Sequence, residues 1–193
     1  MFSLKLIKLG GSLKDRPSLW LLNLLLLFSC VTMRNLPEPG ATRIIENVPF
    51  FPQETYQCGP ASLAGVLSYW GVKVSPEIIA TEIYSKSAKG TLGLDMVLYA
   101  QGKGLQVIQY KGGIKDIKKN IDLGYPVIVL VDYGFWMYQQ NHFMVIVGYN
   151  ENGVIANSGR NRLKFLHEED FLRSWEKTNF WTLLIKPGQV PVP

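Results

Sequence analysis

The chain has 193 residues, which suffices for one domain with a targeting segment and excludes a large multidomain enzyme. Apolar residues make up 47% and charged residues 18%, a composition that can bury a core and excludes a disordered chain. Of the net charge of +5, +3 falls in the first 29 residues, so the remainder gives no reason to expect a nucleic-acid partner. Two cysteines and two distant histidines exclude a disulfide-dense scaffold and a zinc site of ordinary ligand spacing.

Residues 1–29 are predicted to be a signal peptide of the lipoprotein type. Basic residues precede an almost wholly apolar run at residues 19–28, whose helical length of about 15 Å is half the hydrocarbon thickness of a bilayer and too short for a permanent span. The run ends at Leu27-Phe28-Ser29-Cys30, which resembles a bacterial lipobox, so Cys30 is the expected lipidation site. The alternatives are an ordinary signal peptide or an uncleaved anchor. We expect an exported, membrane-anchored protein of a bacterial cell envelope, on the periplasmic side.

A tether and a domain rich in helices follow. Residues 30–43 contain two prolines and a glycine without periodicity, so the tether is expected there, the domain at residues 44–187 and a tail at residues 188–193. Short strands are expected near residues 44–48 and at 105–110. Helices are predicted from apolar stripes, caps and terminal glycines at residues 58–70, 76–84, from about 94 to 102, and from about 114 to 123. The third helix is expected to bury Leu94, Val97 and Leu98.

Strands dominate after Gly124. Buried strands are predicted at residues 126–131 and 143–149, a turn at residues 150–153, and a returning hairpin arm at residues 154–157. A short helix at residues 168–175 and a strand at residues 180–185 complete the chain. Because helices gather before strands, we expect an α+β fold of two layers, with a helical N-terminal half packed on a C-terminal antiparallel sheet.

Cys58 is the candidate nucleophile because it lies at the start of a predicted helix. The unpaired N–H groups there carry partial positive charge, which favours the thiolate that attacks carbonyl carbons. His142 opens a predicted strand and could act as the base, with Asn157 on the hairpin partner to orient its imidazole. Gln53 could form an oxyanion hole together with the backbone N–H of Cys58.

The simple hairpin register does not bring Asn157 to His142. With the turn centred on residues 151 and 152, Asn157 lies opposite Ile146, on the face of His142 but about 13 Å away along the strand. Strong twist, or a bulge near Gly148, would be needed to change this spacing.

Several segments resemble papain-superfamily cysteine peptidases, and most closely the bacteriocin-processing family, which removes leaders ending in a double glycine. The resemblance covers roughly residues 46–186 and is carried by Gln53, Cys58-Gly59-Pro60-Ala61-Ser62-Leu63, His142-Phe143-Met144-Val145-Ile146-Val147-Gly148-Tyr149 and Asn157-Ser158-Gly159. It implies a papain-like fold in which the oxyanion-hole glutamine, nucleophile, base and orienter are Gln53, Cys58, His142 and Asn157. The family usually has Asp at the position of Gln57 and also at the position of Asn157. Gln57 is a second candidate for the oxyanion hole.

The resemblance implies a cysteine peptidase that forms a thioester acyl-enzyme on a peptide or protein substrate without a cofactor or metal. We expect a monomer held at a membrane by its N-terminal lipid. Gln57, Gly59 and Trp136 are candidates to line the substrate cleft, although an aromatic loop around Trp136 could equally be buried. Two other functions stay open: a catalytically silent peptide-binding lipoprotein of the same fold, and an acyltransferase that uses the same nucleophile.

Overall fold

The computed structural model describes residues 42–52, 57–88 and 90–188. They all belong to one compact unit that spans residues 39–193. The predicted signal peptide, most of the predicted tether, Cys30 and Gln53 lie outside the described residues. The domain boundaries proposed from the sequence therefore stay predictions.

The described elements follow the predicted order of helices before strands. The helices are α2 (Cys58–Tyr69), α3 (Pro76–Ile83), α4 (Gly93–Gly102), α5 (Ile114–Asp122) and α6 (Glu168–Glu176). The strands are β1 (Arg43–Ile44), β2 (Tyr84–Ser85), β3 (Gly90–Thr91), β4 (Gln106–Lys111), β5 (Val127–Asp132), β6 (Asn141–Asn150), β7 (Gly153–Ser158), β8 (Asn161–His167) and β9 (Trp181–Lys186).

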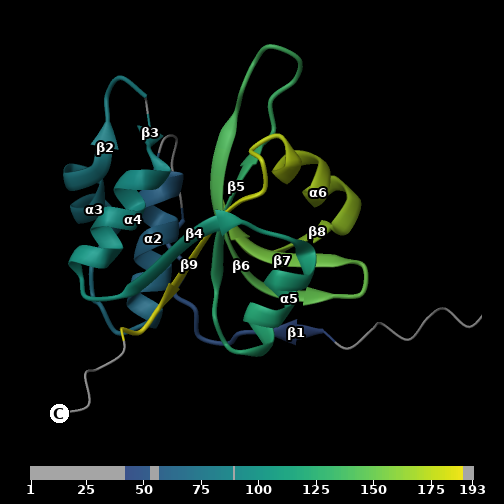
Figure 1. The fold of residues 1–193 in the computed structure, drawn as a ribbon, viewed down its shortest axis with the longest axis horizontal. Helices are drawn as coiled ribbons and strands as arrows, with labels where there is room; N and C mark the ends of the chain where they lie inside the picture. The colour runs from purple at the N-terminus through teal and green to yellow at the C-terminus, as the bar shows by residue number, and fades with distance from the viewer. Residues whose placement is uncertain (1–41, 53–56, 89, 189–193) are drawn as a thin grey trace, which may run out of the picture. The chain divides into compact units, whose positions relative to one another are not determined.

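Within the described residues, the main sheet has seven strands in the order β4-β9-β5-β6-β7-β8, with β1 paired to β6. All of its pairings are antiparallel. Figure 1 shows α2, α3 and α4 gathered on one side of β5 and β6, with α5, α6 and the β7–β8 hairpin on the other. The architecture is α+β, as the sequence predicted.

Local sequence accounts for the helix that carries Cys58. Helix α2 has Pro60 in its first turn, where a missing N–H is tolerated, and its residues from Gly59 to Leu67 are all buried. The predicted stripe residues Leu63, Val66 and Leu67 are fully buried. Helix α2 therefore lies inside the molecule, packed against β6.

Helix α3 begins as its cap predicted. Ser75 Oγ accepts a hydrogen bond from the N–H of Ile78 at 3.4 Å, and Pro76 occupies the first turn. With the helix begun at this point, Ile79 and Ile83 lie on its buried face. Serine followed by proline was therefore a sufficient local signal for this helix start.

The predicted buried face of α4 is wrong. Leu94 and Leu98 are 63% and 57% exposed, and of the predicted stripe Val97 alone packs against the core, half-buried. Met96, Tyr99 and Ala100 are buried instead. Both sets recur at helical spacing, so periodicity alone could not choose between them. Trp181, distant in sequence, packs where a Cβ on Gly93 would lie, so glycine lets α4 approach this side chain closely.

Strand β8 was not predicted. Nearly every residue from Asn161 to His167 is exposed, so this edge strand lacks the buried alternation that marks a half-covered strand. It pairs with β7 through backbone hydrogen bonds. Such a strand is defined by its neighbour and not by its own apolar pattern.

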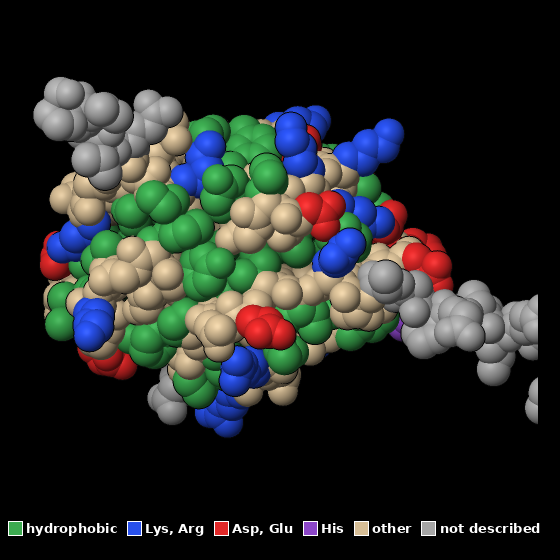
Figure 2. All heavy atoms as spheres, turned by 90° about the horizontal axis from the view of Figure 1, so that it is seen from below, with side chains coloured by type: hydrophobic (Ala, Val, Ile, Leu, Met, Phe, Trp, Pro, Cys, Tyr) green, Lys and Arg blue, Asp and Glu red, His purple; other side chains and the backbone are tan. Residues whose placement is uncertain are grey.

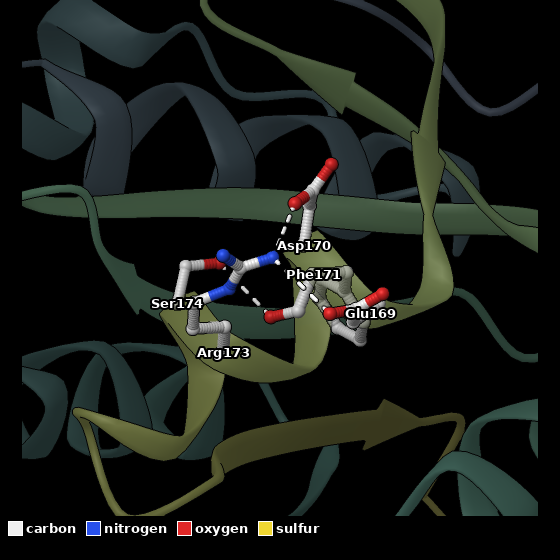
Figure 3. Close-up of polar contacts among 5 residues, drawn as sticks. All are labelled: Glu169, Asp170, Phe171, Arg173 and Ser174. Atoms are coloured by element: carbon white, nitrogen blue, oxygen red, sulfur yellow. Dashed lines mark hydrogen bonds and ion pairs between the residues drawn. The ribbon is translucent and has the colours of Figure 1, made fainter.

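Helix α6 covers the sheet with a polar outer face. Figure 3 shows Arg173 between Asp170 and Glu169, with Nη2 to carboxylate distances of 2.6 and 3.7 Å. These ion pairs are solvent-exposed and contribute little stability, about 0.3–0.5 kcal/mol each. The buried side chains Phe171 and Trp175 anchor the helix instead.

A bulge interrupts the β6–β7 ladder and determines the geometry of the candidate site. Asn150 pairs with Gly153 and Gly148 with Ile155, but Ile146 pairs with Ala156 and Val145 with Asn157. The register therefore shifts by one residue near Gly148. A Cβ at Gly148 would lie 2.5 Å from the carbonyl oxygen of Arg43, so glycine lets β1 approach β6 at this point.

Candidate active site

Cys58 is the first residue of α2, and its sulfur faces the backbone of β6. The N-cap residue Gln57 makes no side-chain capping bond, so the first N–H groups of the helix stay available beside the thiol. Backbone groups of Phe143, of Gly59 and of Cys58 itself lie close enough to the sulfur to lower the pKa of the thiol. Phe143 directly follows His142, so the fold brings the thiol to the segment that carries the histidine.

The Cys58 thiol is protonated at neutral pH. Burial raises the pKa of this thiol above its ordinary value, and the backbone hydrogen bonds with Phe143 and Gly59 offset that effect only in part. The sequence suggested that the helix start favours a thiolate at Cys58. In the structure the helix start alone does not outweigh burial, and the thiol keeps its proton. Loss of the thiol proton needs an acceptor.

His142 lies in β6 opposite Val131 of β5 and is neutral at physiological pH. Burial, together with the nearby positive charge of Lys164, lowers the pKa of His142 from 6.5 to about 4. Among the described residues, the side-chain hydrogen bond of His142 joins its Nε2 to Ser158 Oγ at 3.0 Å. Its ring also packs near that of Tyr133, with centroids 6.0 Å apart. A neutral imidazole is able to accept a proton.

The structure joins His142 to Ser158 and Asn157 to a different partner. Asn157 Oδ1 accepts a hydrogen bond from the N–H of Leu163 at 3.1 Å, beside the left-handed backbone of Leu163 (φ 53°). Because successive strand residues face opposite sides, pairing of Asn157 with Val145 puts it on the face opposite His142. The same register puts Ser158 on the face of His142.

The bulge explains why sequence reasoning missed Ser158. An unshifted hairpin places Asn157 opposite Ile146 and on the face of His142, but a one-residue shift turns each side chain to the other face. Ser158 then lies on the face of His142, and its hydroxyl reaches the imidazole. The signal in the sequence was Gly148, which marks a possible bulge without giving its direction.

The other predicted cleft residues lie in different settings. Gln57 directly precedes Cys58 and is partly buried. A Cβ at Gly59 would lie 2.7 Å from Thr91 Cβ, so Gly59 serves close packing of β3 on α2. Trp136 is 89% exposed in the β5–β6 connection, which rules out the alternative of a buried aromatic loop, and its role in a substrate cleft stays a prediction. Gln53, the predicted oxyanion residue, and Cys30 lie outside the described residues.

Two surface hollows lie away from Cys58. One, of about 340 Å³, is lined by Arg43, Ile121 and Tyr149, and the other, of about 580 Å³, by Asn152, Phe165 and His167. In the described part of the chain, no three histidine, cysteine or acidic side chains gather as metal ligands. None of the described helices is long and apolar enough to cross a bilayer.

A cysteine at the start of a buried helix, close to the strand segment that carries a histidine in an antiparallel sheet, matches the arrangement of a papain-like cysteine peptidase fold. A family model described as "Peptidase_C39 like family" matches residues 45–182, and the chain belongs to that family. A protein of Methanothermobacter thermautotrophicus, itself uncharacterized, is 31% identical over 114 residues, which cover 59% of this chain and 72% of that protein.

Solved structures share the fold. A C39-like peptidase from Bacillus anthracis matches with a TM-score of 0.65 at 18% identity, over 75% of this chain and 97% of that one. A double glycine motif protease from an AMS/PCAT transporter, solved with its leader peptide, matches with a TM-score of 0.60 at 25% identity, over 76% and 99% of the two chains. The peptidase domain of Streptococcus ComA, a bifunctional ABC transporter, matches with a TM-score of 0.58 at 24% identity, over 72% and 98%.

Proposed function

We propose that the protein is a cysteine peptidase in which Cys58 is the nucleophile and His142 the base. The contact of the Cys58 thiol with the backbone of Phe143, next to His142, is the observation that carries this proposal. Membership of the C39-like family supports peptide-bond chemistry. A binding protein of the same fold would not need the thiol to lie next to the segment that carries His142.

The proposed reaction starts from a neutral pair. His142 takes the thiol proton of Cys58 as the sulfur attacks the carbonyl carbon, and a tetrahedral intermediate forms. The protonated imidazole then gives this proton to the leaving amine as the C–N bond breaks and a thioester remains. Water attacks the thioester with His142 again as base, the C–S bond breaks, and the thiol regains its proton.

The carbonyl oxygen needs hydrogen-bond donors when it becomes negative. The uncapped first turn of α2 supplies backbone N–H groups at Cys58 and Gly59. We propose a glutamine side chain as the second donor, with Gln53 implied by the family pattern and Gln57 adjacent to the sulfur. Gln53→Ala and Gln57→Ala are expected to separate the two: loss of turnover with retained thiol reactivity marks the oxyanion residue.

We propose that Ser158 orients His142. Its Oγ lies 3.0 Å from His142 Nε2, which can hold one tautomer of the ring. Asn157, implied for this role by the family pattern, is the alternative and would need the β6–β7 register to change. Orientation by a neutral hydroxyl does not add the negative charge that an Asp would, which agrees with the low pKa of His142.

The decisive experiment compares Cys58→Ala with Cys30→Ser in the full chain. Purified proteins are incubated with a mixture of unstructured peptides, including ones with a double glycine, and products are weighed by mass spectrometry. Cleavage with gain of water that is lost in Cys58→Ala and kept in Cys30→Ser supports the peptidase. New amide linkages would identify an acyltransferase, and binding without any product would identify a binding protein.

We also propose that the domain is exported and anchored through a lipid on Cys30. The lipobox-like sequence supports this proposal. Mass analysis of the mature N-terminus from a bacterial host would test it. A lipid-modified Cys30 as first residue is the expected result, and an unmodified Cys30 or an intact Met1 would contradict it.

A further inference from the structure

The connection between β5 and β6 exposes a run of large apolar side chains. We call residues 133–140 the aromatic loop; Figure 1 shows it projecting beyond the end of the sheet. Phe135, Trp136, Met137 and Tyr138 are 84%, 89%, 86% and 72% exposed. The segment contains no charged residue. Scattered apolar residues are common on surfaces, but four consecutive ones this exposed mark an interaction site.

The aromatic loop is held in shape from its base. The buried carboxylate of Asp132 accepts hydrogen bonds from the N–H groups of Gly134 and Gln140, at 2.7 and 2.8 Å. Lys177 donates to the carbonyl of Gly134 at 2.7 Å. At the tip, the N–H of Tyr138 bonds the carbonyl of Phe135 at 3.1 Å. The exposed side chains are therefore presented by an ordered support.

Basic residues flank the aromatic loop. The β7–β8 turn and the start of β6 lie at the same end of the strands, because β7 runs antiparallel to β6. Arg160, Arg162 and Lys164 follow that turn, and Lys177 contacts the base of the aromatic loop. The acidic first turn of α6 is tied to the opposite edge by the hydrogen bond from Glu168 N to Asn152 O.

The opposite side of the molecule has a different character. Figure 2 shows the face seen from below, away from the aromatic loop, where Asp and Glu side chains are mixed with Lys and Arg around the apolar ones. The uncharged aromatic loop, with Arg160, Arg162, Lys164 and Lys177 at its end of the sheet, differs from this mixed-charge face.

We propose that the aromatic loop inserts into the interface of a membrane that contains anionic lipids. Trp, Tyr and Phe are favoured at the boundary between headgroups and acyl chains, where an apolar body and a polar edge are both satisfied. The basic flank complements anionic headgroups. A projecting tip fits a fluid interface, and the predicted N-terminal lipid would keep the domain close to one. This proposal does not depend on peptidase activity.

Insertion would bring the candidate active site to the membrane surface. The aromatic loop leads directly into Asn141 and His142 at the start of β6. Substrates would then be met at the bilayer surface.

The test uses the full chain and vesicles of phosphatidylglycerol and phosphatidylcholine in which the acyl chains are brominated to quench tryptophan. Emission of the wild type is compared with that of Trp136→Leu, so that the difference isolates Trp136 from Trp20 and the three other tryptophans. The difference emission is expected to shift to the blue in plain vesicles and to be lost in brominated ones. Arg160→Gln/Arg162→Gln should weaken both effects.

A matched control moves the tryptophan. Leu94 on α4 is also exposed, so Leu94→Trp in the Trp136→Leu background restores the tryptophan count away from the aromatic loop, and its emission should stay unquenched. Equal quenching in the wild type and Trp136→Leu would overturn the proposal. So would Trp136 emission that shifts with soluble apolar peptides and not with vesicles, which would assign the aromatic loop to a protein partner.

Discussion

The neutral form of His142 is the one that the proposed reaction needs, and protonation of His142 destabilises the folded protein. The imidazole is partly withdrawn from water and faces the positive charge of Lys164, and both effects oppose protonation. The same environment that keeps it neutral, as the proposed role of a base requires, makes its protonation in acid unfavourable for the folded state. The proposed chemistry and the stability of the fold therefore depend on one residue.

Stability is expected to fall in acid because of His142. Its pKa is about 4 in the folded protein and near 6.5 when unfolded, so the unfolded state binds more protons between these values. The stabilising contribution of neutral His142 to the free energy of unfolding is fully present above pH 6.5. It is lost as the pH falls towards 4, and the loss amounts to up to about 3 kcal/mol. Urea unfolding at several pH values should show this decline. A decline of equal size in His142→Gln would contradict the assignment, and His167→Gln is the control.

The β6–β7 hairpin decides which side chain meets His142. Its bulge near Gly148 shifts the register by one residue, so Ser158 and Asn157 exchange faces relative to an uninterrupted ladder. The uninterrupted register would put Asn157 on the face of His142, whereas the observed register puts Ser158 there. The register of the β6–β7 hairpin therefore decides which side chain faces His142 in the candidate site.

Ser158→Ala and Asn157→Ala are expected to separate orientation from stability. Ser158→Ala removes the hydroxyl at His142 Nε2 and should lower kcat, with a loss of stability of about 0.5–1.5 kcal/mol for this one hydrogen bond. Asn157→Ala removes a buried acceptor from the N–H of Leu163 and should destabilise the fold by about 1–3 kcal/mol. Peptide turnover and urea unfolding of both variants give the comparison. Loss of turnover in a stably folded Asn157→Ala, with Ser158→Ala active, would reverse the roles.

Gly148 should tolerate no larger side chain. A Cβ there would meet the backbone carbonyl of Arg43, so Gly148→Ala must push β1 away or distort the bulge, at a cost of about 1–3 kcal/mol. Gly102, at the end of α4 with nothing within 4 Å, is the matched control and should be neutral or gain up to about 1 kcal/mol as alanine. Thermal or urea unfolding measures both. Equal stability of the two variants would show that β1 yields without cost.

At the scale of the whole molecule, the site exists only where the helical half meets the sheet. Helix α2 supplies Cys58 and β6 supplies His142, and 84 positions separate the two in the chain. Packing of the fully buried residues of α2 against β6 holds the two elements together. Weakening this contact should therefore affect stability and chemistry together.

Leu63→Ala tests that interface. Leu63 is fully buried in α2, so truncation leaves a cavity and should cost about 2–5 kcal/mol. Leu94→Ala, at a 63% exposed position, should change stability by less than about 0.5 kcal/mol. Urea unfolding followed by alkylation of Cys58 in a Cys30→Ser background reports both the fold and the burial of the thiol. A Leu63→Ala protein as stable as Leu94→Ala would contradict the packing.

Much of the fold followed from local patterns. Ser75-Pro76, the glycines after helices and the β-branched run of β5 predict their elements because capping, backbone freedom and strand preference act within a few residues. The placement of Cys58 at a helix start was confirmed for the same reason. Strand β8 and the buried face of α4 were missed because each depends on a neighbour distant in sequence.

The sequence by itself determined the five helices, most strands of the main sheet, the α+β class, and the positions of Cys58 and His142 on their helix and strand, since these depend on the period of apolar residues and on local backbone preferences. Only the tertiary structure decided that Ser158 faces His142, that both candidate groups are neutral, and that the aromatic loop is exposed. Register, burial and surface display arise from packing between segments far apart in the chain, where a one-residue shift or a helix rotation reverses which side chain faces inward.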